Sequence, residues 1–513
     1  MYMINKRELR MDKNILDILT KINLNNLNFS DENQIKNAFI SLFNVIESLA
    51  NENRELKEEN QRLRDEINRL KGENGKPDIK ANGNTKGKNV LKIDKHKTEP
   101  KKWEKSSKKD KIKIDRVEII KFDKNQLPSD VEFKGYHERT IQNIEIKTDN
   151  VLYKLESYYS PSEGKTYTAE IPEYLKTTEF GPELKAFVYM LYFDCRVTEY
   201  KIAEILQSNG IHISEGTISN ILIKDMSEEF TEEKKEIFDS ALETSKYHQI
   251  DDTGIRVDCV NHYATILCNE DYAAYFIRRY KNRETVKKIL CGVDETDVVD
   301  IDTIKTLIKI LICDDAPQFK KLTESLGLCW IHEERHYEKM IPVIPHNVKL
   351  LEDVISQIWD YYKELKEYKK NPHETDKIRL YTKFDDIFLQ ETGYEELDSR
   401  LALTYNKKEC LLLVLEHPYI PLHNNLSEIG ERTIVIKRKI SGGVRNNAGR
   451  VAWENGLTIL ATCKKHTVNF YSYVRDIFAG CSDRLHLSNL ISEKNIIQNQ
   501  QLPVKLDILE QTG

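Results

Sequence analysis

The stretch that decides the fold reads His248-Gln-Ile-Asp-Asp-Thr-Gly-Ile-Arg-Val-Asp258. Apolar and β-branched residues alternate in it with polar ones, a pattern typical of a strand with one buried face. Asp251 and Asp252 stand in the middle of this strand, where successive side chains point to opposite faces. A buried carboxylate without a partner is costly, so each needs a partner, a metal ion or a place on the surface.

The segment after this strand continues the sheet and brings a second pair of acids. Alternation and apolar runs predict, in chain order, strands at His262–Asn269 and Ala273–Tyr280, a helix at Arg283–Leu290 and an apolar strand at Leu307–Cys313. Asp314 and Asp315 come directly after the last strand. This is the order of a ribonuclease H-like core, in which the first and fourth strands lie side by side. We therefore predict a multidomain α/β protein in which Asp251 and Asp314 lie close together, with Asp252 and Asp315 turned away.

A third acidic position lies in Pro421–Gly443, where the turn His423-Asn-Asn425 opens a predicted helix that carries Glu428 and Glu431. Basic residues crowd the end of this helix and the loop after it: Arg432, Lys437, Arg438, Lys439, Arg445 and Arg450. An enzyme that acts on a phosphate backbone needs this combination of an acid for a metal ion and positive charge for DNA. A solvated charged helix, whose lysines favour its C-terminus, is the alternative.

Length and composition bound the class of protein. The chain has 513 residues and a net charge of −6, so any nucleic-acid binding must use local basic patches. It has no apolar run long enough to span a membrane, and its first residues lack the apolar core of a signal peptide. Its nine cysteines form no Cys-x-x-Cys pair, which favours reduced thiols. We expect a cytoplasmic protein without a membrane partner.

Leucine recurs at every seventh residue after a polar N-terminal segment, residues 1–40. The leucines are Leu42, Leu49, Leu56, Leu63 and Leu70. With these at d positions, Asn53 and Asn60 occupy a positions, where a buried Asn fixes the register of a parallel dimer. We predict a leucine-zipper coiled coil over 41–72 that forms a homodimer or higher oligomer. A single amphipathic helix packed on its own domain is the alternative.

Two segments of different composition follow the zipper. Residues 76–116 contain 15 Lys and Arg against 6 Asp and Glu, with few residues that could form a core. We predict a basic disordered linker at 73–116 that can lie on phosphates. Alternating patterns return afterwards and predict a small β-rich module at 117–175.

Helical patterns occupy the next segment, 180–228. Ser214 can cap the second of two helices joined by a short turn, and that helix carries Thr217, Ser219 and Asn220. The pair resembles a helix-turn-helix with these three residues facing DNA, and a plain helical hairpin is the alternative. The remaining boundaries are a catalytic core at 240–328 and 421–460, a helical insertion at 329–420 and a helical tail at 461–513.

Four motifs together resemble the insertion-sequence-sixty-six family of DDE transposases, of the large transposase-C type. They are, in order, Asp251-Asp-Thr253; Asp314-Asp-Ala-Pro-Gln-Phe319; Cys329-Trp330-Ile-His332 followed by Arg335 and Tyr337; and Asn424-Asn425-Leu-Ser-Glu428 followed by Arg432 and Arg438-Lys439. The resemblance runs from about residue 180 to residue 478, and the zipper fits the same family.

The resemblance implies a DNA transposase with Asp251, Asp314 and Glu428 as catalytic acids. In such an enzyme these acids bind two Mg²⁺ or Mn²⁺ ions, and the reactions are cleavage at transposon ends and strand transfer into target DNA. It also implies a bacterial protein that associates with the nucleoid when bound to DNA. Glu431, three residues further along the helix, is expected to lie outside the site.

Two departures from the family pattern bear on these implications. The family usually carries a cysteine-rich zinc module before the catalytic domain, but residues 117–172 contain no cysteine, so we predict the module without its metal. The family also favours Asp at the position of His423.

Two alternatives to an active transposase follow from the same residues. One is a non-catalytic DNA-binding protein derived from a transposase. The presence of all three acids in the sequence argues against this alternative. The other is a zinc peptidase, because His332-Glu333-Glu-Arg-His336 matches the His-Glu-x-x-His pattern of two zinc ligands and a general base.

Overall fold

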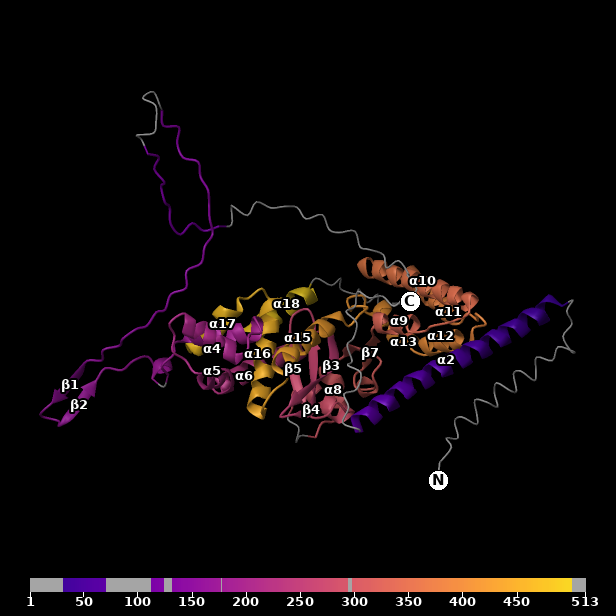
Figure 1. Ribbon diagram of the computed structural model, residues 1–513, viewed down its shortest axis with the longest axis horizontal. Coiled ribbons are helices and arrows are strands. Elements are labelled where there is room, and N and C mark those ends of the chain that lie inside the picture. The colour runs from indigo at the N-terminus through magenta and orange to yellow at the C-terminus, as the bar shows by residue number, and fades with distance from the viewer. Residues whose placement is uncertain (1–30, 71–111, 124–131, 177, 294–297, 501–513) are drawn as a thin grey trace, which may run out of the picture. The chain divides into compact units, whose positions relative to one another are not determined.

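The computed structural model describes residues 31–70, 112–123, 132–176, 178–293 and 298–500 (Figure 1). The chain divides into two compact units, one made of residues 1–77 and 153–513 and the other of residues 78–152. In the second unit the described residues form neither helix nor strand. The elements that concern the candidate site all belong to the first unit.

A five-stranded mixed sheet forms the centre of the first unit, with the strand order β5-β4-β3-β6-β7. The strands are β3 (His248–Val257), β4 (Val260–Cys268), β5 (Ala273–Arg278), β6 (Ile310–Cys313) and β7 (Ser325–Leu328). β3, β4 and β5 pair antiparallel, whereas β6 pairs parallel with β3 and β7 parallel with β6. Asp258 and Cys259 both take a positive φ in the two-residue turn between β3 and β4, as a tight hairpin requires.

The predicted strand order is confirmed, and two details differ. Residues 301–307 form helix α8 (Ile301–Leu307), so the apolar strand β6 begins later than predicted. The Asp300 side chain accepts the backbone N–H of Ile301 at 2.7 Å and so favours a helix start that the apolar pattern hides. β7 was not predicted, because four residues are too few for alternation to show.

Helices cover the sheet, and one lies unusually close to it. Helix α15 (Asn425–Ser441) packs against β3 and β4, and α16 (Asn447–Lys465) packs against β5 (Figure 1). A Cβ added at Gly430 would lie 3.2 Å from the Ile266 side chain and 3.3 Å from the Tyr275 hydroxyl. The close approach of α15 to β4 therefore requires glycine at this position.

The remaining helices fall into two groups around this core. Before the sheet lie α3 (Pro182–Tyr189), a π-helical turn at Met190–Asp194, α4 (Glu199–Ser208), α5 (Glu215–Ile223) and α6 (Ser227–Thr244). Between β7 and α15 lie α9 (Trp330–Glu338), α10 (Pro345–Lys370), α11 (Glu374–Phe388), α12 (Glu395–Tyr405), α13 (Lys408–Leu411) and α14 (Leu413–Glu416). After α16 come α17 (Phe470–Phe478) and α18 (Leu487–Gln500).

Helix α2 (Glu32–Leu70) covers the predicted zipper and begins nine residues before the predicted start at residue 41. One of its faces packs on the helical insertion through Asn44, Glu47 and Asn51: Asn44 donates to the carbonyl of Gly393 at 3.0 Å, Asn51 donates to Glu396 at 2.8 Å, and Glu47 is 2% exposed. The Glu47 carboxylate accepts the backbone N–H groups of Val343 and Ile344 and so caps the start of α10. The heptad leucines lie outside this contact and are 38–79% exposed. The helix itself is therefore confirmed and packs on its own chain, whereas pairing through the exposed leucines stays a prediction.

The β-rich module predicted at 117–175 is wrong in its extent. Within its described residues the only strands are β1 (Ser157–Ser160) and β2 (Lys165–Thr168), which form one antiparallel hairpin. The other alternating stretches have no neighbouring strand to pair with and are exposed. The basic segment 73–116 lies outside the described residues except for 112–116. None of the helices in the described ranges is long and apolar enough to cross a membrane.

Candidate active site

The pairing of β3 with β6 brings the two predicted aspartates to one edge of the sheet. His248 lies opposite Leu311 and Gln249 opposite Ile312 in this parallel pair. Continuing this register sets Asp251, on β3, level with Asp314, directly after β6. Parallel strands end at the same edge of a sheet, so the two carboxylates come from segments far apart in the sequence to one place.

The charges of the other acids act on Asp251. Its pKa is raised to about 7, chiefly by burial and to a smaller extent by the charges of Asp314, Asp252 and Glu428. Only the N–H of Asp252, which donates to Asp251 at 2.9 Å, acts in the opposite direction. The predicted acids Asp251, Asp314 and Glu428 are therefore brought together.

Glu431 joins this group, contrary to the sequence prediction that it lies outside. Burial raises the pKa of Glu431 to about 9, and the charge of Asp251 is the next cause. Its Oε1 is buried without a hydrogen-bond partner in the described part of the chain. Residues three apart lie on the same face of a helix, so Glu428 and Glu431 both face β3 from α15. The three-residue spacing of Glu428 and Glu431 is the feature of the sequence that could have predicted that Glu431 joins the acid group.

The two neighbouring aspartates are paired with lysines instead. Asp252 forms an ion pair with Lys281 at 3.0 Å and accepts a hydrogen bond from Gln318 at 2.8 Å. Asp252 nevertheless lies near enough to raise the pKa of Asp251, so it is not fully turned away from the site. Burial favours the neutral form of Asp315, but hydrogen bonds from Lys320 and Lys407 outweigh burial and lower its pKa.

A buried amide, Asn424, anchors the start of α15 beside these acids. Its side-chain Nδ2 donates to the carbonyl of Ile250 on β3 at 2.8 Å, and the backbone carbonyl of Asn424 accepts the N–H of Glu428 at 3.2 Å. Gln249, also on β3, accepts the N–H of Leu426 at 3.2 Å. Asn424 is thus bonded to β3, the strand that carries Asp251, and Glu428 follows it by one helical turn. These bonds therefore fix the position of Glu428 relative to β3. The sequence marked Asn424 as part of a motif but gave no sign of its anchoring role.

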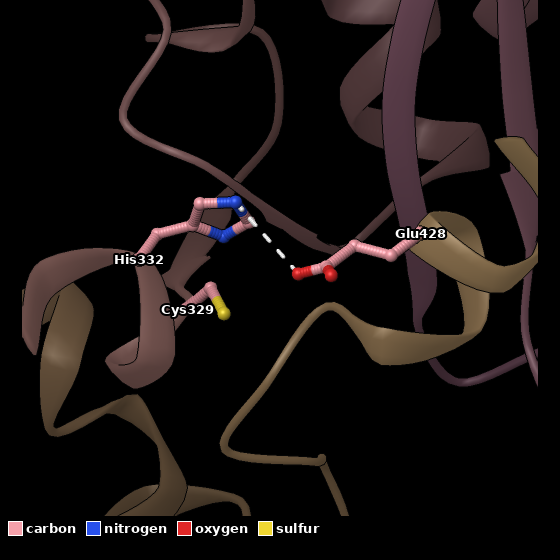
Figure 2. A group of neighbouring side chains, drawn as sticks. All are labelled: Cys329, His332 and Glu428. Atoms are coloured by element: carbon pink, nitrogen blue, oxygen red, sulfur yellow. Dashed lines mark ion pairs between the residues drawn. The ribbon is translucent and has the colours of Figure 1, made fainter. Parts of the chain in front are cut away.

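The motif that begins at Cys329 contacts Glu428 from helix α9. Cys329 precedes α9, and its Sγ accepts the N–H of Asn424 at 3.3 Å. His332 and Arg335, in the first and second turns of α9, face the two carboxylate oxygens of Glu428 at 3.7 Å and 3.6 Å. Figure 2 shows His332 directed at Glu428. Trp330 points into the insertion and packs against Tyr361 and other aromatic rings. The predicted motif residues therefore gather around the third acid.

Three of the basic residues predicted to contact DNA instead contact other residues of the protein. Lys437 is 3% exposed and lies 3.4 Å from the ring centre of Tyr192, and burial lowers its pKa to about 7. This burial removes Lys437 from the predicted DNA-contacting set. Arg438 donates to the carbonyl of Gly254, and Arg450 forms an ion pair with Glu454 at 2.5 Å.

The remaining predicted contacts keep exposed or partly exposed positions. Arg432, Lys439 and Arg445 are exposed on and after α15. In the helix-turn-helix-like pair, Asn220 is exposed, whereas Thr217 and Ser219 are half-buried. The Ser214 side chain caps α5 as predicted and accepts the N–H of Thr217 at 3.1 Å.

The arrangement required for a zinc peptidase does not form. Both carboxylate oxygens of buried Glu333, the base in that interpretation, are bound by Arg400, Thr404 and Lys407. His336 joins none of the metal-capable groups found among the described residues.

Comparisons with known proteins agree with the motifs that surround the site. The profile of the Transposase IS66 family matches residues 177–452, more than half of the chain and every residue of the acid group. A protein named "Uncharacterized protein y4jO", from Sinorhizobium fredii (strain NBRC 101917 / NGR234), is 41% identical over 167 residues, which is 33% of this chain and 51% of that protein. The chain thus spans about half the length of this relative. No solved structure matches. From the extent of the profile match, the chain belongs to the Transposase IS66 family.

Proposed function

We propose that the chain is a DNA transposase that cleaves phosphodiester bonds at insertion-sequence ends and transfers the freed ends to target DNA, with Asp251, Asp314 and Glu428 as its catalytic acids. The observation that carries the proposal is the parallel pairing of β3 with β6, which sets Asp251 level with Asp314 beneath the helix that carries Glu428. A non-catalytic DNA-binding protein would not need three acids from separate segments held together at a cost in repulsion.

The topology of the sheet supports the same proposal. Three antiparallel strands followed by two parallel ones, with the first strand at the centre, are the arrangement of a ribonuclease H-like core. In such a core the acids at the ends of the central strands act on a phosphate backbone. Fold alone does not define an activity, so the proposal rests on the acids and the family together.

The chemistry of the acid group suits a pair of divalent cations, although the carboxylate oxygens of Asp251, Asp314 and Glu428 do not all lie within 4.8 Å of one another and would have to draw together around the ions. Mg²⁺ and Mn²⁺ prefer oxygen ligands, which Asp251, Asp314 and Glu428 supply. Asp251 has no ion pair within the described residues, and the raised pKa shows that its charge is poorly compensated by the protein. When bound, two such ions would activate the attacking water or 3′-hydroxyl and stabilise the leaving oxygen.

The protein's own residues would supply positioning and charge. Asn424 and Gln249 hold the start of α15 on β3, and Arg438 ties the end of the same helix to the carbonyl of Gly254. Arg432 and Lys439 are exposed on α15 and would contact the phosphate backbone. DNA affinity would therefore depend on side chains other than the acids.

A second copy of the chain is the proposed partner for the exposed face of α2. Leu56 and Leu63 are 55% and 53% exposed and follow the part of the helix that packs on the insertion. Replacing both by Asp should lower the solution mass measured by light scattering without disturbing the Asn44 and Glu47 contacts. An unchanged mass would show that this face does not mediate oligomerisation.

The catalytic proposal is tested with purified protein, Mg²⁺ and labelled terminal-repeat DNA. Asp314→Asn should reduce cleavage by roughly a thousandfold or more, because a metal ligand at the reacting phosphate is worth several kcal/mol. Asp315→Asn is the matched control, since the next residue in the chain is paired with Lys320 and Lys407. Cleavage that survives in Asp314→Asn would contradict the assignment.

A further inference from the structure

Three side chains of different chemistry meet beside the acid group. Ligand atoms of Cys329, His332 and Glu428 all lie within 4.8 Å of one another (Figure 2). Cys329 is 2% exposed, and the other two are partly buried. The proposed catalytic function does not use the thiol or the imidazole, so this cluster calls for its own explanation.

The cysteine is held as a metal ligand would be. Burial raises the pKa of the Cys329 thiol, and hydrogen bonds from the backbone N–H groups of Asn424, His332 and Ile331 only partly offset this rise. The amide of Asn424 donates to Sγ at 3.3 Å. Such outer hydrogen bonds are typical partners of metal-bound thiolates, and they fix the sulphur in the direction of His332.

The histidine offers a nitrogen that has no partner. Nδ1 of His332 is buried without a hydrogen-bond partner in the described residues, whereas Nε2 faces Glu428. A buried, unpaired ring nitrogen is costly unless something binds it. One carboxylate oxygen of Glu428 faces Arg335 and the other faces this cluster.

A second metal-capable group in the described part of the chain is already neutralised. Glu233, Glu236 and His486 also lie within ligand distance of one another. Glu233, however, forms an ion pair with Arg484 at 2.7 Å and accepts the Tyr473 hydroxyl. Glu428 also faces a cation, Arg335 at 3.6 Å, but only through the oxygen that does not face His332, and none of the ion pairs among the described residues involves Cys329.

We propose that Cys329, His332 and Glu428 bind one divalent ion of the zinc type, next to the ions proposed for Asp251 and Asp314 and sharing Glu428 with them. Thiolate and imidazole ligands select Zn²⁺ and disfavour Mg²⁺, which prefers oxygen. Three protein ligands leave a fourth tetrahedral position for solvent. The ion would join the start of α9 to the first turn of α15 and thereby fix Glu428.

The test uses the full-length protein without DNA, so its result does not depend on transposase activity. The purified, metal-stripped chain is titrated with Co²⁺, which takes zinc sites and gives a thiolate charge-transfer band in the near ultraviolet. The wild type should bind about one ion with this band, and excess Mg²⁺ should not displace it. Cys329→Ser should lose the band.

Two further variants keep the test decisive. His332→Gln changes a partly exposed side chain and should weaken Co²⁺ binding by more than the roughly tenfold caused by losing an outer hydrogen-bond partner. Cys463→Ser is the matched control, because Cys463 is equally buried but belongs to no metal-capable group among the described residues. Absence of the band in the wild type, or its persistence in Cys329→Ser or at full affinity in His332→Gln, would overturn the proposal.

Discussion

Two regions of this protein bury carboxylates, and they treat them in opposite ways. In the helical insertion, Glu333 is bound by Arg400, Thr404 and Lys407; burial opposes its charge, but these partners prevail and lower its pKa. At the edge of the sheet, burial and neighbouring acids raise the pKa of Asp251 to about 7 and that of Glu431 to about 9. The protein neutralises the acid in the insertion with its own cations, whereas the acid group lacks such compensation, as the proposed binding of an external cation would require.

Removing the neutralised acid should have the largest effect on stability. Glu333→Gln would leave the partly buried Arg400 and Lys407 without their shared partner, although Lys407 keeps its ion pair with Asp315, at a cost of up to about 3–5 kcal/mol. Denaturant unfolding measures this loss. Glu431→Gln is the matched control and should change the free energy of unfolding by about 1 kcal/mol or less, because Glu431 is already neutral at pH 7. Equal losses in the two variants would break the contrast between the regions.

The pH dependence of stability should sharpen the contrast. Asp251 and Glu431 have pKa values that rise from 3.8 to about 7 and from 4.5 to about 9 on folding, so the folded state binds more protons between these values. Without divalent ions, the free energy of unfolding contributed by these two groups should fall as pH rises from about 4 to about 9. Mg²⁺ should restore stability most at the upper end.

Thermal unfolding across this pH range, with and without Mg²⁺, checks the prediction. The Asp251→Asn, Glu431→Gln double variant removes both titrating groups and should flatten the curve. A wild-type curve that rises with pH in the absence of metal and coincides with that of the double variant would show that these carboxylates are not poorly compensated.

A smaller effect is expected at a third carboxylate, on α2. Glu47 caps the start of α10 through the N–H groups of Val343 and Ile344, so it is neutralised by dipoles rather than by cations. Glu47→Ala should cost about 1–2 kcal/mol. Hydrogen exchange should show faster opening of the first turn of α10, while α12 serves as the internal control. Unchanged exchange would show that the cap does not stabilise this contact.

The elements that a local sequence pattern defines could be predicted from the sequence alone. Alternation in His248–Val257 and the apolar run before Asp314 predict the two strands that carry the first acids, and the family motif predicts Glu428. Long-range packing decided the rest. The sequence predicts Lys437 as a DNA contact, but in the structure the rings of Tyr192 and Trp453 enclose its ammonium group. Likewise, no residue near Glu47 in the sequence indicates that Glu47 contacts the start of a helix almost 300 residues away.

The same limit applies within the site. Asn424 acts through Ile250 and Cys329, which the sequence separates by 174 and 95 residues. Glu431 enters the acid group because Gly430 lets α15 approach β4 closely. The three-residue spacing suggested a shared face with Glu428, but only the packing of α15 shows which face meets the sheet.

The choice between the two acids of α15 tests the central claim most directly. Cleavage of labelled terminal-repeat DNA in Mg²⁺ is measured for Glu428→Gln and Glu431→Gln, with DNA binding followed in parallel. The account predicts that Glu428→Gln loses cleavage while binding DNA nearly as well as the wild type, and that Glu431→Gln retains most of its cleavage. Full cleavage by Glu428→Gln together with its loss in Glu431→Gln would contradict it.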